Sequence, residues 1–159
     1  LGGFYSTFTE FLGFRPYHDE GKVMGLAPYG KYQEKLQQKL DKFIPFDADT
    51  GDFIVNPNLR YVGDHTFGRR YTDEFVKIFG KPRDRESALE SQYSDLAFAV
   101  QYRLEKIVNS LIDKHKTNFK GIGQPLRVAL TGSKFGPGLY NIILSLDKNE
   151  TIKRLKMIK

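Results

Sequence analysis

The chain has 159 residues, and its 40% hydrophobic content, with 13 Phe and 9 Tyr, is typical of a globular domain rather than a disordered segment. It contains no cysteine, which excludes disulfides and thiolate metal sites and is compatible with a reducing cytoplasm. The formal net charge of +6 permits an anionic partner, but the lysines are dispersed until the C-terminal tail. We therefore expect solvated charged faces and no nucleic-acid partner. We also expect no membrane association, because no apolar run of spanning length is present.

Aromatic residues recur at helical spacing near the N-terminus and predict an amphipathic helix of about three turns. The stripe consists of Phe4, Phe8, Phe11 and Leu12. We interpret it as core rather than as a ligand platform. The chain opens without methionine and in the middle of this pattern, so we interpret it as a fragment of a longer protein.

The stretch 13–30 is dense in glycine and proline and also carries charged residues. Asp19 suits the start of a short helix over Glu20–Leu26, because negative charge is favourable at a helix N-terminus. This helix would contain Gly21 and Gly25, each of which costs about 1 kcal/mol relative to alanine. Two interpretations remain open: a tight connector with two packing glycines, or a segment whose backbone is approached closely by another group.

Further along, residues 32–40 predict a second helix, with leucines on one face and Gln and Lys on the other. Residues 43–46 and 53–55 are short strand candidates on either side of the turn 47–52. That turn is rich in aspartate, but a calcium loop would need a glycine at its sixth position and a glutamate at its twelfth, where Asn58 stands. We predict a hairpin turn.

Residues 60–70 show little periodicity and are expected to form a loop that carries His65. Thr72 is a good N-cap for a helix that runs to about Phe79. Residues 81–85 form a linker rich in charge.

Ser87 and Glu90 have the spacing of a capping box. They would open a long helix over residues 88–116, whose continuous apolar stripe predicts the longest and most central helix of the domain. Residues 126–130 form a short apolar run bounded by chain-breaking residues, which predicts a buried strand.

Two glycine-containing segments have the features of a phosphate site. Glycines let backbone N–H groups approach a phosphate, a helix N-terminus adds partial positive charge, and a lysine supplies the counter-charge. The segment from Asp19 to Gly25 has these parts, and the turn after the predicted strand provides a second such edge. The candidate cofactor-binding residues are Asp19, Glu20, Gly21, Lys22, Gly25, Thr131 and Gly132.

No catalytic set is evident in the chain itself. His18, His65 and His115 lack the spacing of metal ligands and are interpreted as ordinary surface or loop histidines. Motifs of a serine nucleophile are absent. The catalytic residues are therefore unknown from the sequence, and no metal ligand is assigned.

Several stretches together resemble one enzyme family. Gly13-Phe14 is followed by the block DEGKVMGLAPYG at residues 19–30, and aromatic residues precede both at 4–12. Later runs at 71–83 and 95–101 occur in the same order and at similar spacing. The combination resembles the O-carbamoyltransferases of nodulation-factor and antibiotic biosynthesis (the NodU/CmcH type).

The resemblance covers residues 1–132 and implies an α/β, helix-rich fold, part of an actin-like ATPase domain of the ASKHA or ribonuclease H-like class. It implies ATP-dependent transfer of a carbamoyl group from carbamoyl phosphate, through carbamoyl-adenylate, to a hydroxyl of a small-molecule acceptor such as a sugar. It also implies a divalent metal, iron in this family, whose ligands would lie outside this chain. Residues 133–159 depart from the family's pattern and are interpreted as a divergent or truncated tail. On this interpretation the chain is an enzyme fragment that is inactive alone.

Two other hypotheses remain. One is a non-catalytic helical binding or scaffold module. The other is a sugar-kinase-like phosphotransferase on the same fold, which would need a catalytic aspartate and phosphate loops that the sequence does not show.

Overall fold

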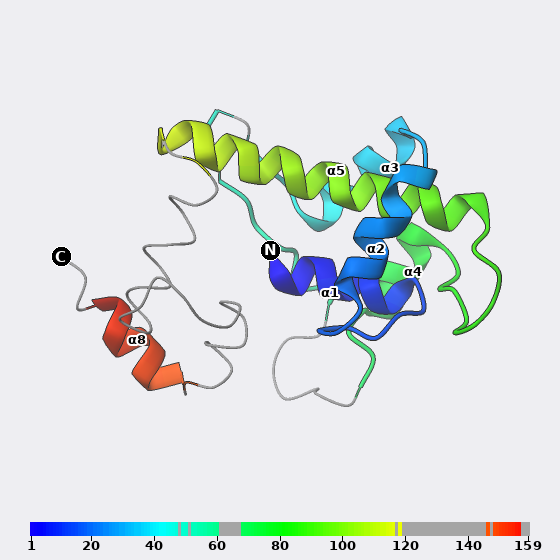
Figure 1. The fold of residues 1–159 in the computed structure, drawn as a ribbon, viewed down its shortest axis with the longest axis horizontal. Coiled ribbons are helices and arrows are strands. Elements are labelled where there is room, and N and C mark those ends of the chain that lie inside the picture. The colour runs from blue at the N-terminus through cyan, green and yellow to red at the C-terminus, as the bar shows by residue number, and fades with distance from the viewer. Residues whose placement is uncertain are drawn as a thin grey trace. The chain divides into compact units, whose positions relative to one another are not determined.

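The computed structural model describes residues 1–47, 49–50, 52–60, 68–116, 118, 146 and 148–156. The chain divides into two compact units, which we name the N-terminal unit (Leu1–Ser110) and the C-terminal unit (Leu111–Lys159). The described elements are α1 (Gly2–Phe11), α2 (Glu20–Leu26), the 3₁₀ turn η1 (Ala27–Tyr29), α3 (Glu34–Phe43), α4 (Asp73–Phe79), α5 (Ser91–Lys114) and α8 (Lys148–Lys156) (Figure 1). No helix among these described residues is both long enough and apolar enough to cross a membrane.

The core of the N-terminal unit is built from phenylalanine rings of three helices. Phe8 of α1 is fully buried, and its ring centroid lies 5.6 Å from that of Phe43 on α3. It also lies 5.1 Å from Phe75 and 5.0 Å from Phe79 on α4. Tilted and edge-to-face rings at these distances contribute stabilisation beyond the area that they bury. The prediction that the N-terminal aromatic stripe is core is confirmed.

The turn after α1 is held by an arginine from far along the chain. Gly13 has a φ of +79°, which glycine adopts readily. Arg83 is only 7% exposed, and its Nε donates a hydrogen bond of 2.7 Å to the carbonyl oxygen of Leu12. Its backbone N–H donates to the carbonyl of Phe11 at 2.9 Å. The predicted linker 81–85 is therefore anchored on the C-terminal end of α1.

The hairpin turn is confirmed, although the two strands predicted beside it are reduced to a single antiparallel bridge between Phe46 and Phe53. Asp47 N–H donates to the carbonyl of Asp52 at 2.9 Å, which closes the turn. Phe43 is the last residue of α3 and does not belong to a strand. In this position its ring is buried in the aromatic core, 5.6 Å from the ring of Phe8.

Of the predicted fold class, only the high helix content is confirmed. The described residues form helices with isolated bridges, and nothing among them indicates an actin-like ATPase fold. The strand predicted at 126–130 lies outside the described residues.

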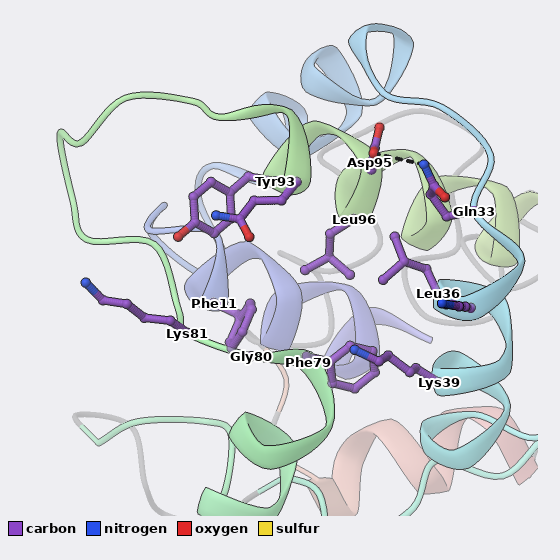
Figure 2. Close-up of a pocket in the computed structure, with 12 residues that line it drawn as sticks. Phe11, Gln33, Leu36, Lys39, Phe79, Gly80, Lys81, Tyr93, Asp95 and Leu96 are labelled. Carbon is purple, nitrogen blue, oxygen red and sulfur yellow. Dashed lines mark hydrogen bonds between the residues drawn. The ribbon is translucent and has the colours of Figure 1, made fainter.

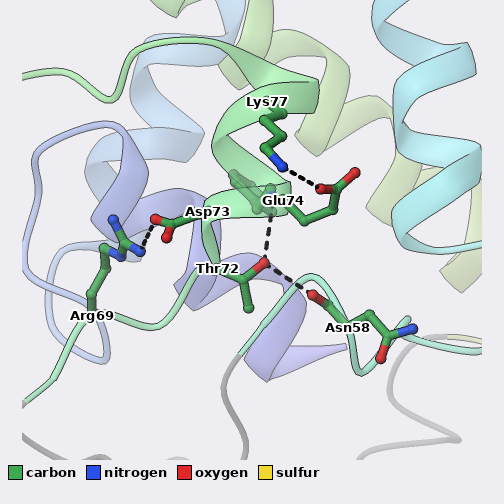
Figure 3. Close-up of polar contacts among 7 residues, drawn as sticks. Asn58, Arg69, Thr72, Asp73, Glu74 and Lys77 are labelled. Atoms are coloured by element: carbon green, nitrogen blue, oxygen red, sulfur yellow. Dashed lines mark hydrogen bonds and ion pairs between the residues drawn. The ribbon is translucent and has the colours of Figure 1, made fainter.

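Helix α4 begins at the predicted cap. The Thr72 side-chain oxygen accepts a hydrogen bond of 3.2 Å from Phe75 N–H, and its hydroxyl donates to the carbonyl of Asn58 at 2.9 Å (Figure 3). Lys77 and Glu74 form an ion pair of 3.3 Å one turn further along. The cap therefore fixes both the start of α4 and the preceding chain.

Helix α5 is continuous over 24 residues and is the longest described helix, as predicted. Its start differs from the prediction, because Ser87 and Glu90 form no capping box. The Ser87 hydroxyl donates instead to the carbonyl of Asp84 at 2.8 Å, and the Ser87 carbonyl accepts a hydrogen bond from Arg83. With Ser87 engaged in this way, the helix begins only at Ser91.

Candidate functional site

The carboxylates of the predicted nucleotide-binding segment are engaged by their own loop. The Asp19 Oδ2 accepts a hydrogen bond of 3.1 Å from Arg15 N–H. The Glu20 Oε1 accepts hydrogen bonds from Tyr17 N–H at 2.5 Å and from the Ser6 hydroxyl at 2.7 Å. These contacts fix the loop before α2 against α1.

Lys22 is also engaged locally. Its Nζ lies 3.2 Å from the Asp19 Oδ2, and His18 Nδ1 lies 3.0 Å from the other carboxylate oxygen. The hydrogen bond from His18, followed by that from the Arg15 backbone, holds the pKa of Asp19 well below its usual range. Asp19 is therefore ionised at neutral pH and compensates the charge of Lys22.

The two glycines of α2 face open space. Within the described part of the chain, no neighbouring heavy atom lies within 4 Å of the position that a Cβ would take at Gly21 or Gly25. Close approach occurs at Gly30 instead, where a Cβ would stand 2.1 Å from the carbonyl oxygen of Ser94. The interpretation that a neighbouring backbone packs against Gly25 is therefore wrong for the described chain.

The second glycine-containing segment, which carries Thr131 and Gly132, lies outside the described residues. The assignment of the seven residues to cofactor binding stays a prediction. No group of three His, Asp or Glu side chains that could hold a metal occurs among the residues described, and His65 lies outside them.

Charge is distributed unequally between the two units. Residues 111–159 contain ten Lys and Arg against three Asp and Glu, which gives +7, whereas residues 1–110 contain 15 against 16, which gives −1. The whole excess of positive charge thus belongs to the C-terminal unit. The sequence already shows that the lysines are dispersed only until the C-terminal tail, but we drew no functional conclusion from that tail, and counting the charge separately for each part of the chain gives the excess its size.

Helix α8 shows how this positive charge is presented. Its sequence has one acidic residue, Glu150, against four basic residues (Lys148, Lys153, Arg154 and Lys156). The Arg154 Nε lies 2.7 Å from one Glu150 oxygen, and the Lys153 Nζ lies 3.9 Å from the other. Glu150 is the one carboxylate in the sequence of α8, and the Lys153 side chain beside it is 73% exposed, so α8 presents accessible positive charge at Lys153. Such charge attracts polyanions, phosphate backbones among them.

The comparisons with known proteins define the class of the chain. The anticodon-binding domain family matches residues 73–159, more than half of the sequence, and this match includes α8 and the whole C-terminal unit. The chain belongs to the anticodon-binding domain family.

Among its relatives, a glutamate–tRNA ligase of Pelagibacter ubique is 71% identical over 135 residues, which are 78% of this chain and 28% of that protein. A glutamate–tRNA ligase 2 of Coxiella burnetii is 32% identical over 148 residues, 85% of this chain and 30% of the relative. An uncharacterized protein of Synechocystis is 38% identical over 111 residues, 68% of this chain and 17% of the relative. The chain therefore spans less than a third of each of these proteins.

The family match overturns the resemblance to O-carbamoyltransferases. The predictions of carbamoyl-transfer activity and of a carbamoyl phosphate partner are therefore wrong. The expectation that no nucleic acid is bound is contradicted as well. The glycine-rich block at 19–30 that carried the resemblance lies outside the matched segment. The segment 133–159, which was interpreted as a divergent tail, lies inside it. The expectations of ATP and of iron depended on that resemblance, and the described residues do not test them.

Proposed function

We propose that the chain is a non-catalytic tRNA-binding module that contacts the anticodon end of its RNA. The observation that carries the proposal is the match of residues 73–159 to the anticodon-binding domain family. Of the hypotheses left open by the sequence, the non-catalytic helical binding module fits this family match better than the carbamoyltransferase does. Because relatives at 71% and 32% identity are glutamate–tRNA ligases, we propose a glutamate-accepting tRNA as the partner. The whole protein would then attach glutamate to tRNA in the cytoplasm.

The charge distribution supports this function on physical grounds. RNA binding is favoured when lysines and arginines neutralise backbone phosphates and release condensed counterions. The C-terminal unit carries +7 and the N-terminal unit −1, so we assign the phosphate contacts to the C-terminal unit. Lys153 on α8 is a described side chain suited to such a contact, since it is exposed and its Nζ lies 3.9 Å from the Glu150 carboxylate.

The test measures binding of a fluorescently labelled anticodon stem-loop of a glutamate tRNA across a range of salt concentrations. We expect log K to fall linearly with log salt, because each phosphate contact contributes a slope of about −0.7 to −0.9. A stem-loop with altered anticodon bases should bind more weakly at every salt concentration, because the bases carry the specificity.

Chain variants identify the surface. Lys153→Ala should reduce the salt slope by about one contact, roughly 0.7–0.9. Lys77→Ala is the matched control, because Lys77 is 74% exposed and also pairs with a glutamate three residues before it, but it lies in the N-terminal unit. Equal effects of the two changes would contradict the assignment to the C-terminal unit. Equal binding of the altered anticodon would contradict anticodon recognition.

A further inference from the structure

The N-terminal unit contains a cavity of about 270 Å³ that the tRNA-binding proposal does not use. It lies between α3, the C-terminal end of α4 and the N-terminal end of α5, and Phe11 of α1 also lines it (Figure 2). All of these elements belong to the unit whose net charge is −1. Its volume is just below that of ordinary small-molecule sites, which are about 300–1,000 Å³.

One side of the cavity is apolar. Phe11, Phe79 and Leu96 are each less than 10% exposed and present buried carbon surface to it. Leu36 of α3 and Leu96 of α5 point toward one another across the space (Figure 2). A flat or branched hydrocarbon group would be desolvated here, which is favourable in proportion to the area that it buries.

The α3 side of the cavity is cationic. Lys35 and Lys39 both line the cavity and stand four residues apart, a spacing at which like charges repel. Neither has an ion pair within the part of the chain that the structure describes. The Lys39 side chain extends from α3 in the direction of Phe79 (Figure 2). An anion bound between the two lysines would relieve their repulsion.

The acidic groups near the cavity have hydrogen-bond or ion-pair partners other than Lys35 and Lys39. The Asp95 carboxylate accepts hydrogen bonds from Lys31 N–H at 2.7 Å and from Gln33 Nε2 at 3.2 Å. Of the acids on α3, Glu34 accepts a hydrogen bond from the Tyr32 hydroxyl, and Asp41 pairs with Arg103. None of these carboxylates forms an ion pair with Lys35 or Lys39 among the residues that the structure describes.

We propose that this cavity binds a small organic anion. Its apolar body would rest on Leu36, Phe79 and Leu96, and its carboxylate or phosphate would be held by Lys35 and Lys39. Either anionic group fits, because a lysine ammonium acts as a point charge with three donors and does not demand the planar geometry that an arginine does.

The test is calorimetric titration of the full chain with two probes, phenyl phosphate and phenylacetate, which share the aromatic body and differ in the anion. Saturable binding of either probe in the micromolar to millimolar range is expected, and the stronger of the two identifies the preferred anion. Inorganic phosphate and benzyl alcohol each keep only one half of the ligand and should bind at least about tenfold more weakly, a difference of about 1.4 kcal/mol.

The double variant K35Q/K39Q should lose at least about tenfold in affinity for the better probe, whereas K77Q on α4 should change it less than twofold. Circular dichroism of K35Q/K39Q should match wild type, because it removes charge at residues without ion pairs among those described. The proposal would be overturned by no saturable binding of either aromatic probe, by equal binding of inorganic phosphate, or by wild-type affinity in K35Q/K39Q. The tRNA proposal would be untouched by such a failure, since Lys153 belongs to the other unit.

Discussion

Replacing Gly25 or Gly30 by alanine adds the same methyl group in two different surroundings, and we expect opposite effects on stability. Gly25 lies inside α2 with no neighbouring described atom within 4 Å of the new Cβ. Gly30 is extended, with φ −92° and ψ 171°, and follows η1. The Cβ at this position would lie 2.1 Å from the carbonyl oxygen of Ser94 and 2.5 Å from its carbonyl carbon.

The magnitudes follow from these distances. Gly25→Ala should raise the free energy of unfolding by about 0.5–1 kcal/mol, because alanine favours the helix and restricts the unfolded chain. Gly30→Ala should lower it by about 1–3 kcal/mol, the usual cost of overpacking. The obstacle is the backbone of the first turn of α5, which cannot rotate away as a side chain can. The two variants should therefore differ by roughly 1.5–4 kcal/mol.

Urea denaturation followed by far-ultraviolet circular dichroism measures both effects. The midpoint should rise for Gly25→Ala and fall for Gly30→Ala, while the slope m stays that of wild type if the folded surface is unchanged. A Gly30→Ala variant as stable as wild type would refute the close packing of residue 30 on α5. A destabilised Gly25→Ala would refute the open space beside α2.

Three further predictions concern contacts of the same unit. Thr72→Ala removes the oxygen that accepts from Phe75 N–H and should cost about 1 kcal/mol in a denaturant titration, whereas Thr72→Ser should keep most of the stability. Arg83→Ala leaves the Leu12 carbonyl without its charged donor and should lower the free energy of unfolding by about 1.5–3 kcal/mol. A loss below about 0.5 kcal/mol would mean that this hydrogen bond contributes little to stability. Asp19 has a lowered pKa in the folded chain, so the stability that it supplies is present above its unfolded pKa of about 3.9 and is lost as the pH falls toward the folded value. Asp19→Asn should therefore flatten the acid limb of the stability profile, and an unchanged limb would contradict this linkage.

Local structure could be predicted from the sequence where no distant residue competed for the same polar groups. The bounds of α2 and the Thr72 cap were predictable, because a helix start and its N-cap depend on residues three or four positions apart. The capping box at Ser87 failed because Arg83 and Asp84 take its polar groups. Nothing in the spacing of Ser87 and Glu90 reveals that competition.

The functional prediction failed for a related reason. The block at 19–30 is conspicuous because its glycines, prolines and charges build a loop and a packed turn, and Gly30 serves the contact with α5. These structural roles do not identify a chemistry. The charge on which the proposed function rests is spread over ten lysines and arginines after residue 110, and its size emerges when the charge is counted for each unit separately.

The aromatic core sets a limit on where this protein can be cut. A fragment that begins at Asp73, where the family match begins, would keep Phe75 and Phe79 but lose the rings of Phe8 and Phe43 that cover them. It would therefore expose α4 to water and to aggregation. The segment that the family model matches is smaller than the set of helices that pack around α4, so a shortened version intended for the proposed RNA binding has to retain α1 and α3 wherever it keeps α4.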